Sequence, residues 1–120
     1  MEALQCTTVI INERICKAMV DCGCTKTLVH KDWCEKWERK DIEMLTITGK
    51  KWKCLGVARV QMKTEGGLML EMEVNVLETR PFGFSCVLGL DAIRRLGGVT
   101  IYGDCSMRFC AEGDWCNPKQ

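Results

Sequence analysis

The sequence predicts an all-β domain with one or two short helices, and three observations support this prediction. β-branched and apolar residues gather in segments of strand length, turn-forming residues separate these segments, and residues 68–77 alternate between apolar and polar side chains. The apolar positions are Leu70, Met72, Val74 and Val76, and the polar ones are Glu71, Glu73 and Asn75. Such alternation is typical of a strand with one face on a core and the other in water.

The composition indicates a globular chain. Of its 120 residues, 47% are hydrophobic and 28% are charged, which excludes a disordered segment or a membrane protein. The formal net charge of +1 gives no global attraction to nucleic acid or to an anionic membrane, so we expect neither as a partner. No apolar run approaches the roughly 18 residues that a membrane-spanning helix needs.

The cysteine content bears on the cellular compartment. Ten cysteines would indicate a disulfide framework in a secreted chain of this length. The first residues, MEALQC, have neither the basic start nor the long apolar run of a signal peptide. We therefore expect a cytoplasmic, intracellular protein whose cysteines remain thiols and fill the core as small hydrophobic side chains.

Strands account for most of the expected elements. Each expected strand is a short segment rich in β-branched or alternating apolar residues, and a turn signal such as Asn12-Glu13-Arg14 or Glu65-Gly66-Gly67 stands between neighbours. We expect strands over residues 7–12, 15–20, 42–48, 53–63, 68–77, 85–88, 99–102 and 107–110. This succession favours a single mainly β domain over the whole chain.

Two short helices interrupt the strands. The first is expected from about Lys31 to Arg39, because Asp32 with Glu35 resembles a capping box. Trp33 and Trp37 would then share one helical face. The second covers residues 92–96, where Asp91 is placed to cap the first turn and Gly97 or Gly98 to end the helix.

One acidic residue stands out at the end of a strand. Asp21 follows the apolar residues 18–20 and precedes Gly23 by two positions, a setting that on its own usually marks a turn. A second segment, CVLGLD at residues 86–91, places two apolar residues and a glycine directly before the second helix. The two segments, with a β hairpin between them, resemble the retropepsins, the aspartic proteases of retroviruses and LTR retrotransposons. The resemblance extends from about Val9 to Tyr102.

The resemblance implies a retropepsin-like, closed β-barrel-like domain over residues 1–120, with residues 111–120 as a flexible tail. Peptide hydrolysis of this kind needs two carboxylates that share a proton. The sequence offers only Asp21 in a strand-loop-glycine setting, since Asp91 is interpreted as a helix cap and Asp104 and Asp114 as turn residues. The second carboxylate must then come from a second copy, in a symmetric homodimer. Residues 6–11 and 107–110 are our candidates for strands at the dimer interface.

The remaining roles follow from the resemblance alone. The active-site loop would contain Asp21, Cys22, Gly23, Cys24, Thr25 and Thr27, with a buried structural hydrogen bond at Thr27. The flap over the substrate would contain Gly49, Lys50, Lys51 and Trp52, and the support beneath the loop Val87, Leu88 and Gly89. Side chains near Leu28, Val29 and Phe82 to Phe84 would line specificity pockets. The substrate would be a peptide or the polyprotein of a retroelement, cleaved without a cofactor and in part within virus-like particles.

Cys22 departs from the family pattern, which has Thr or Ser at this position. The hydroxyl normally ties the two active loops of the dimer together, and a thiol is the weaker donor and acceptor. A functional but weaker dimer is one reading. The alternative is a catalytically impaired or domesticated retropepsin-fold module that dimerises or binds peptides.

Two other chemistries are weighed against this hypothesis. Cys22, Cys24, His30 and Cys34 could be considered as a zinc set, but structural zinc sites more often use Cys-x2-Cys pairs, so no metal is expected. A nucleophilic pair of His30 with Cys24 or Cys34 lacks a recognisable third group to orient the histidine. We expect His30 at the surface, at the start of the first helix.

Overall fold

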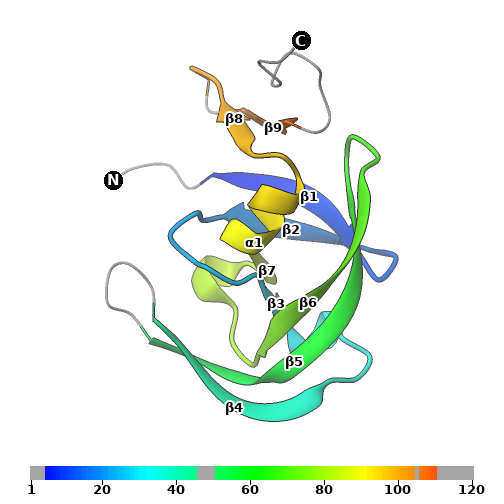
Figure 1. Cartoon of the computed structure of the whole chain (residues 1–120), viewed down its shortest axis with the longest axis vertical. Coiled ribbons are helices and arrows are strands. Elements are labelled where there is room, and N and C mark those ends of the chain that lie inside the picture. The colour runs from blue at the N-terminus through cyan, green and yellow to red at the C-terminus, as the bar shows by residue number, and fades with distance from the viewer. Residues whose placement is uncertain (1–4, 46–50, 105, 111–120) are drawn as a thin grey trace.

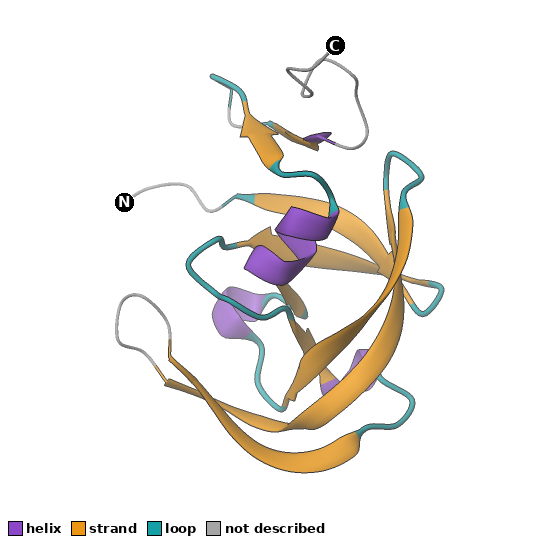
Figure 2. Ribbon diagram, in the orientation of Figure 1, coloured by secondary structure: helices purple, strands orange, loops and turns teal. Residues whose placement is uncertain are grey.

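The computed structural model describes residues 5–45, 51–104 and 106–110, and it is built mainly of strands (Figures 1 and 2). The strands are β1 (Cys6–Ile11), β2 (Arg14–Val20), β3 (Leu28–His30), β4 (Glu38–Leu45), β5 (Lys51–Thr64), β6 (Met69–Leu77), β7 (Cys86–Leu88), β8 (Val99–Ile101) and β9 (Met107–Phe109). The helices are two single 3-10 turns, η1 (Lys31–Trp33) and η2 (Pro81–Gly83), and the α-helix α1 (Leu90–Arg95). The expected tail at 111–120 lies outside the described residues.

The main sheet closes on itself. Its strands follow the order β1-β2-β7-β3-β6-β5-β4, and an additional pairing of β1 with β5 completes a ring from which β4 is left out. Figure 1 shows β5 curving along the barrel, with β4 on its outer side. β8 and β9 pair with each other in a separate small sheet that follows α1. The predicted all-β barrel with short helices is therefore confirmed.

The β1–β2 hairpin illustrates how the local sequence sets the register. Asn12 and Glu13 form the two-residue turn, and both have positive φ, at 48° and 70°. Two left-handed residues match the twist of the flanking strands, and Asn tolerates this conformation better than most residues. The turn places Ile11 opposite Arg14 and Ile10 opposite Ile15.

The short strand β7 lies between β2 and β3, and this position determines where the site forms. It runs parallel to β2, with Val87 opposite Met19, and antiparallel to β3, with Val87 also opposite Leu28. Because β7 lies between β2 and β3, the chain that joins those two strands has to cross the end of β7. Residues 21–27 make this crossing. All three residues of β7 are buried, as its apolar sequence CVL permits.

The core has two apolar clusters, and cysteines contribute to both. Cys16, Cys34 and Cys86 belong to the larger cluster inside the barrel, and Cys24 and Cys54 belong to a smaller one near residues 21–27. All five side chains are buried thiols, whereas Cys6 and Cys22 are exposed. The expectation of thiols as core side chains is confirmed for these five. No described helix has the length and apolarity that crossing a membrane would require.

The first predicted helix is wrong. Only Lys31–Trp33 form a helical turn, of the 3-10 type, and Cys34 already has extended dihedral angles of −112° and 123°. From Glu38 the chain is β4, which pairs antiparallel with β5 and starts with Glu38 opposite Val57. The capping-box pattern reflects a local preference for helix, but backbone hydrogen bonds to β5 stabilise the strand more than this preference stabilises a helix. Trp33 and Trp37 still pack against the core, from a turn and a loop.

Two residues expected at the surface are buried. His30 is 3% exposed and is the last residue of β3. Asn75 was assigned to the water-facing side of its strand, but it too is 3% exposed, at the end of β6 that pairs with β3, where the N–H of Asn75 donates to the carbonyl of Thr27. Glu71 and Glu73, before that pairing begins, are exposed as predicted. A strand read by alternation alone does not reveal where a neighbour covers its second face.

The buried thiols make the stability of the fold depend on pH in the alkaline range. Burial raises the pKa of Cys16, Cys34 and Cys54 from 9.0 to about 11, which means that the folded state resists losing these protons. Stability from this source is complete below about pH 9 and is lost as the pH rises toward about 11. With Cys34→Ala, we expect the loss of unfolding free energy between about pH 8 and pH 11 to be smaller by roughly 2 kcal/mol. Urea unfolding at several pH values measures this loss.

The matched control is Cys22→Ala, which removes an exposed thiol. It should keep the alkaline loss of the unsubstituted protein, and equal losses in all three proteins would contradict the role of the buried thiols.

Candidate active site

Asp21 lies at the point where β2 leads into the crossing loop. Its backbone N–H donates to the carbonyl of Leu88 at 3.0 Å, so it is still joined to β7. Its carboxylate Oδ1 accepts from the N–H of Gly23 at 2.9 Å, and its own carbonyl accepts from the N–H of Cys24 at 3.1 Å. These three bonds fix both the backbone and the side chain of a half-buried carboxylate.

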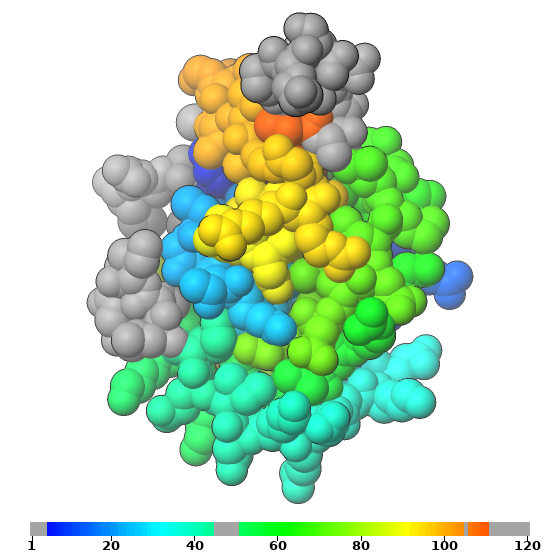
Figure 3. Space-filling model, in the orientation of Figure 1, coloured from blue at the N-terminus to red at the C-terminus, as the bar shows by residue number. Residues whose placement is uncertain are grey.

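The loop rests on the end of β7 and the start of α1. The N–H of Leu90 donates to the carbonyl of Cys24 at 2.7 Å, and that of Asp91 to the carbonyl of Thr25 at 3.3 Å. Figure 3 shows the light-blue loop against the yellow helix at the surface. The first amides of a helix have no partner within the helix, and here they serve to hold the loop.

Gly89 allows this close approach. A Cβ atom at this position would lie 2.6 Å from the carbonyl carbon of Lys26 and 2.8 Å from the carbonyl oxygen of Cys24. Both neighbours are backbone atoms and have no side-chain freedom with which to move away. The glycine is therefore needed for contact between the loop and its support, not for an unusual dihedral angle.

Thr27 is fully buried and has hydrogen bonds from all its polar groups. Its Oγ1 donates to Oδ1 of Asp91 at 2.7 Å and accepts from the N–H of Gly89 at 3.1 Å. Its N–H donates to the same Asp91 oxygen at 3.0 Å, and its carbonyl accepts from the N–H of Asn75 at 3.0 Å. The buried hydrogen bond expected at Thr27 is present, within a larger network than the sequence indicated.

The role assigned to Asp91 from the sequence is corrected. α1 begins at Leu90, and its N-cap is Gly89, which has no side chain to make a capping bond. Asp91 is inside the first turn, where its carboxylate accepts from Thr27 and from the N–H of Ala92. One signal could have indicated this. A buried threonine needs an acceptor, and Asp91 is the carboxylate nearest in sequence to the strand that supports the loop.

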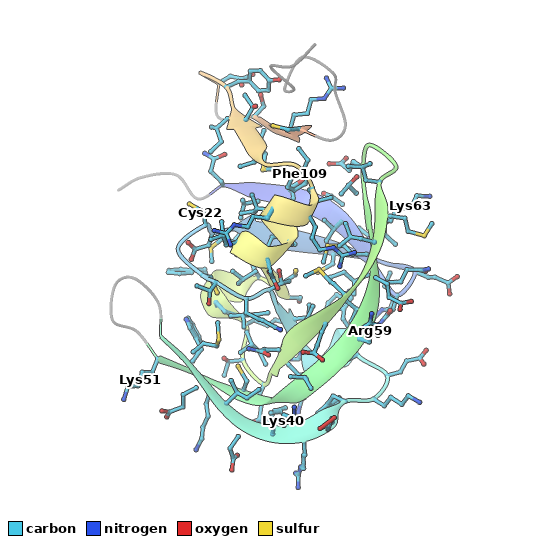
Figure 4. All side chains as sticks on the ribbon, in the orientation of Figure 1. Cys22, Lys40, Lys51, Arg59, Lys63 and Phe109 are labelled. Atoms are coloured by element: carbon cyan, nitrogen blue, oxygen red, sulfur yellow. The ribbon has the colours of Figure 1, made fainter. Side chains whose placement is uncertain are left out.

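The two cysteines of the loop differ in environment. Cys22, labelled in Figure 4, is exposed beside Asp21. Cys24 is 2% exposed, and its thiol donates to the carbonyl of Lys26 at 3.1 Å. Burial is the main reason why the pKa of Cys24 is raised, and the Asp21 and Asp91 carboxylates add to it, against the opposing effect of the Lys26 carbonyl bond. Cys24 is therefore a neutral packing thiol rather than a nucleophile.

Apolar side chains surround the loop on the side of the β4–β5 hairpin. Ile42, Met44, Trp52 and Phe84 are partly buried and pack against the smaller core cluster, which includes Met19, Cys24, Leu28 and Val87. Lys51 and Cys22 lie on the same side of the molecule in Figure 4. Of the predicted flap, Lys51 and Trp52 begin β5, whereas Gly49 and Lys50 lie outside the described residues.

The predicted lining residues are divided between the core and the surface. Leu28 and Val29 are buried in β3, with 1% and 0% exposure. Phe82 is 68% exposed, on the η2 turn, where its φ of 52° and the φ of 82° at Gly83 bend the chain sharply. Phe84 then returns to the smaller cluster.

The geometry does not support the nucleophilic alternative. His30 accepts at Nδ1 from the N–H of Asp32 at 3.1 Å, and its Nε2 lies 3.1 Å from the carbonyl of Glu78, to which it donates as a neutral ring. The thiol of Cys34 donates to the backbone carbonyl of His30, at 3.9 Å. Within the described parts of the chain, no group of three His, Cys, Asp or Glu side chains is placed to hold a metal ion.

Comparison with known proteins shows which solved structures have a similar fold. No protein-family model matches the sequence, and no curated protein is significantly similar to it. Among solved structures, the chain is similar to EIAV protease in complex with the inhibitor HBY-793, with a TM-score of 0.63 and 18% identity over 85% of this chain and 96% of that one. It is also similar to the retroviral protease-like domain of Ddi1 from Leishmania major, with a TM-score of 0.60 and 16% identity over 86% and 85% of the two chains.

A third similar structure is protein Lpg0085 of Legionella pneumophila, described as of unknown function. Its TM-score is 0.54, at 18% identity over 78% of this chain and 87% of that chain. With the closed ring of strands and the single described α-helix, the first two likenesses establish that this chain has a retropepsin-like fold.

The contact at Gly89 can be tested by adding one methyl group. We expect Gly89→Ala to force the loop away from β7 and to lower the free energy of unfolding by about 1–3 kcal/mol, as overpacking does elsewhere. Thermal or urea unfolding measures this change. Gly103→Ala is the control, because a Cβ atom there would meet open space. Equal stability of the two variants would contradict the close contact.

Proposed function

We propose that this protein is an aspartic endopeptidase that acts as a homodimer, with Asp21 as the carboxylate that each copy contributes. The observation that carries the proposal is the position of Asp21. Three hydrogen bonds hold it where the crossing loop leaves β2, with its carboxylate bonded to the N–H of Gly23. The retropepsin-like fold supports the proposal, because aspartic proteases of the retroviral type use this fold.

The chemistry requires a second copy. One carboxylate acts as a base on a water molecule while the other, protonated, polarises the carbonyl of the peptide bond. Among the residues that the structure describes, Asp21 is the aspartate at the end of a strand before a glycine loop, and Asp91 is bonded to Thr27 behind that loop. Two Asp21 residues related by a two-fold axis would share one proton and titrate as a pair.

The elements around Asp21 have roles in this proposal. Gly23 would leave room for the substrate backbone, and Val87, Leu88 and Gly89 would support the loop from below. The end of the β4–β5 hairpin, with Gly49, Lys50, Lys51 and Trp52, would close over the peptide and exclude water. The partly buried apolar side chains of the smaller cluster offer contacts for apolar residues of a substrate.

The biological setting belongs to the same proposal. A single protease domain over residues 1–120 would be released from the polyprotein of an LTR retrotransposon or retrovirus-like element and would cleave that polyprotein. It would act in the cytoplasm and within virus-like particles, on peptide substrates and not on nucleic acid or membranes.

Cys22 is the observation that favours a second candidate function. Its thiol is exposed next to Asp21, where retropepsins have a hydroxyl. Weaker bonds between the two loops would lower dimer stability, and a chain that no longer cleaves could retain the fold as a module for dimerisation or peptide binding.

The catalytic proposal is tested with Asp21→Asn. This substitution removes the charge but keeps an acceptor for the N–H of Gly23, so the fold should persist while cleavage of a peptide library falls below detection. The unsubstituted protein should cleave at some pH between mildly acidic and neutral and be inhibited by pepstatin. Asp41→Asn, at an exposed position of β4, should retain full activity. A well-folded unsubstituted protein without pepstatin-sensitive cleavage would favour the binding module instead.

The role of Cys22 is tested with Cys22→Thr. A hydroxyl at this position should restore hydrogen bonds between the loops, and each bond of about 1 kcal/mol would tighten the dimer roughly fivefold. Sedimentation equilibrium measures the dimer dissociation constant, alongside turnover. Cys22→Val is the matched control, since valine has the shape of threonine without its hydroxyl. An unchanged dissociation constant and turnover in Cys22→Thr would overturn this explanation.

A further inference from the structure

The carboxylate of Asp91 gathers an unusual number of donors on one oxygen. Oδ1 accepts from Thr27 Oγ1 at 2.7 Å, from the N–H of Ala92 at 2.7 Å and from the N–H of Thr27 at 3.0 Å. Two of the three donors come from the crossing loop and not from the helix to which Asp91 belongs. This one oxygen therefore joins the crossing loop to the first turn of the helix.

The direction of these bonds is fixed by the chemistry of the groups. An ionised carboxylate only accepts, so the single hydroxyl proton of Thr27 has to point at Asp91. The hydroxyl lone pairs are then left to accept from the N–H of Gly89 at 3.1 Å. Thr27 is fully buried, and loss of its acceptor would leave two donors without a partner away from water.

The network continues from Gly89 to Asp21. Gly89 follows Leu88, whose carbonyl accepts from the N–H of Asp21 at 3.0 Å. A second path runs through the N–H of Leu90, which holds the carbonyl of Cys24, while the N–H of Cys24 holds the carbonyl of Asp21. Asp91 therefore fixes the loop at its far end, and the two paths fix Asp21 at its near end.

A purely structural role at the helix terminus does not explain this arrangement. The helix already has its N-cap at Gly89, with no side-chain cap bond. The Asp91 side chain turns back toward Thr27, which is 64 residues away in the sequence. The only bond that it makes within its own helix is to the neighbouring Ala92.

We infer that Asp91 is a positioning residue of the proposed catalytic site. Through Thr27 and Gly89 it holds the loop that carries Asp21, and it does not touch the substrate. This inference rests on the proposed function, since positioning has a catalytic meaning only if Asp21 is catalytic. This role requires a hydrogen-bond acceptor at the position of Asp91 Oδ1, and it does not require the negative charge.

Two substitutions separate these properties. Asp91→Asn retains an acceptor oxygen and removes the charge, whereas Asp91→Ala removes the acceptor. We expect Asp91→Asn to keep kcat within about threefold, and Asp91→Ala to lower kcat about 100-fold with KM changed by less than about threefold, because a misplaced Asp21 impairs the chemistry more than peptide binding. Asp41→Ala, at an exposed carboxylate, is the control and should match the unsubstituted protein.

Amide hydrogen exchange supplies a readout that does not depend on activity. In Asp91→Ala the N–H groups of Thr27 and Gly89 should exchange about 10-fold to 100-fold faster, while amides in the middle of the β5–β6 pairing, such as that of Val60, keep their rates. Asp91→Asn should leave both sets unchanged. If Asp91→Ala does not fold, Thr27→Ser and Thr27→Val repeat the comparison, with only the serine hydroxyl able to bridge Asp91 and Gly89.

The outcomes distinguish the inference from the proposed function. An inactive unsubstituted protein would overturn the proposed function, and the exchange rates would still decide whether Asp91 holds the loop. Equal loss of kcat in the Asn and Ala variants, a rise confined to KM, or unchanged exchange at Thr27 and Gly89 would each overturn the positioning role.

Discussion

The close contact between the crossing loop and Gly89 is the constraint on which the arrangement of the site depends. Residues 21–27 pass over the end of β7 with backbone against backbone, where no Cβ atom fits. The contact brings the first amides of α1 within reach of the loop carbonyls, and it brings Asp91 within reach of Thr27. The Asp21 carboxylate is bonded to the nearby N–H of Gly23, and the Asp21 N–H is bonded to the carbonyl of Leu88 in β7. The position of Asp21 follows from how firmly the rest of the loop is held.

Much of the fold could be predicted from the sequence, because strands and tight turns depend on local pattern. The hairpin at Asn12-Glu13, the alternation that leads into β6 and the final pair β8–β9 are all determined by neighbouring residues. The helix over Lys31–Arg39 was wrong for a non-local reason. Its charged residues suit a helix surface as well as a strand edge. The segment is a strand because it pairs with β5, and β5 comes later in the chain, outside the local sequence.

In the site, too, some features could be predicted from local sequence and others could not. Asp21 and the segment 86–89 are visible in sequence as a pair, because each combines a strand end with a glycine. The burial of His30 and of Asn75 could not be predicted, since it depends on which elements pack around these residues. The partner of Asp91 was indicated only by the need of a buried Thr27 for an acceptor. Periodicity describes one element at a time, whereas buried polar groups are satisfied between elements.

The closure of the barrel also limits how a second copy could join this one. β1 uses one edge for β2 along its whole length and the other edge for β5 from Val9 to Ile11. Only the stretch before Val9 is left outside the pairing with β5 among the described residues of this strand. Within β1, pairing of this edge with a second copy would therefore be confined to residues Cys6 to Thr8.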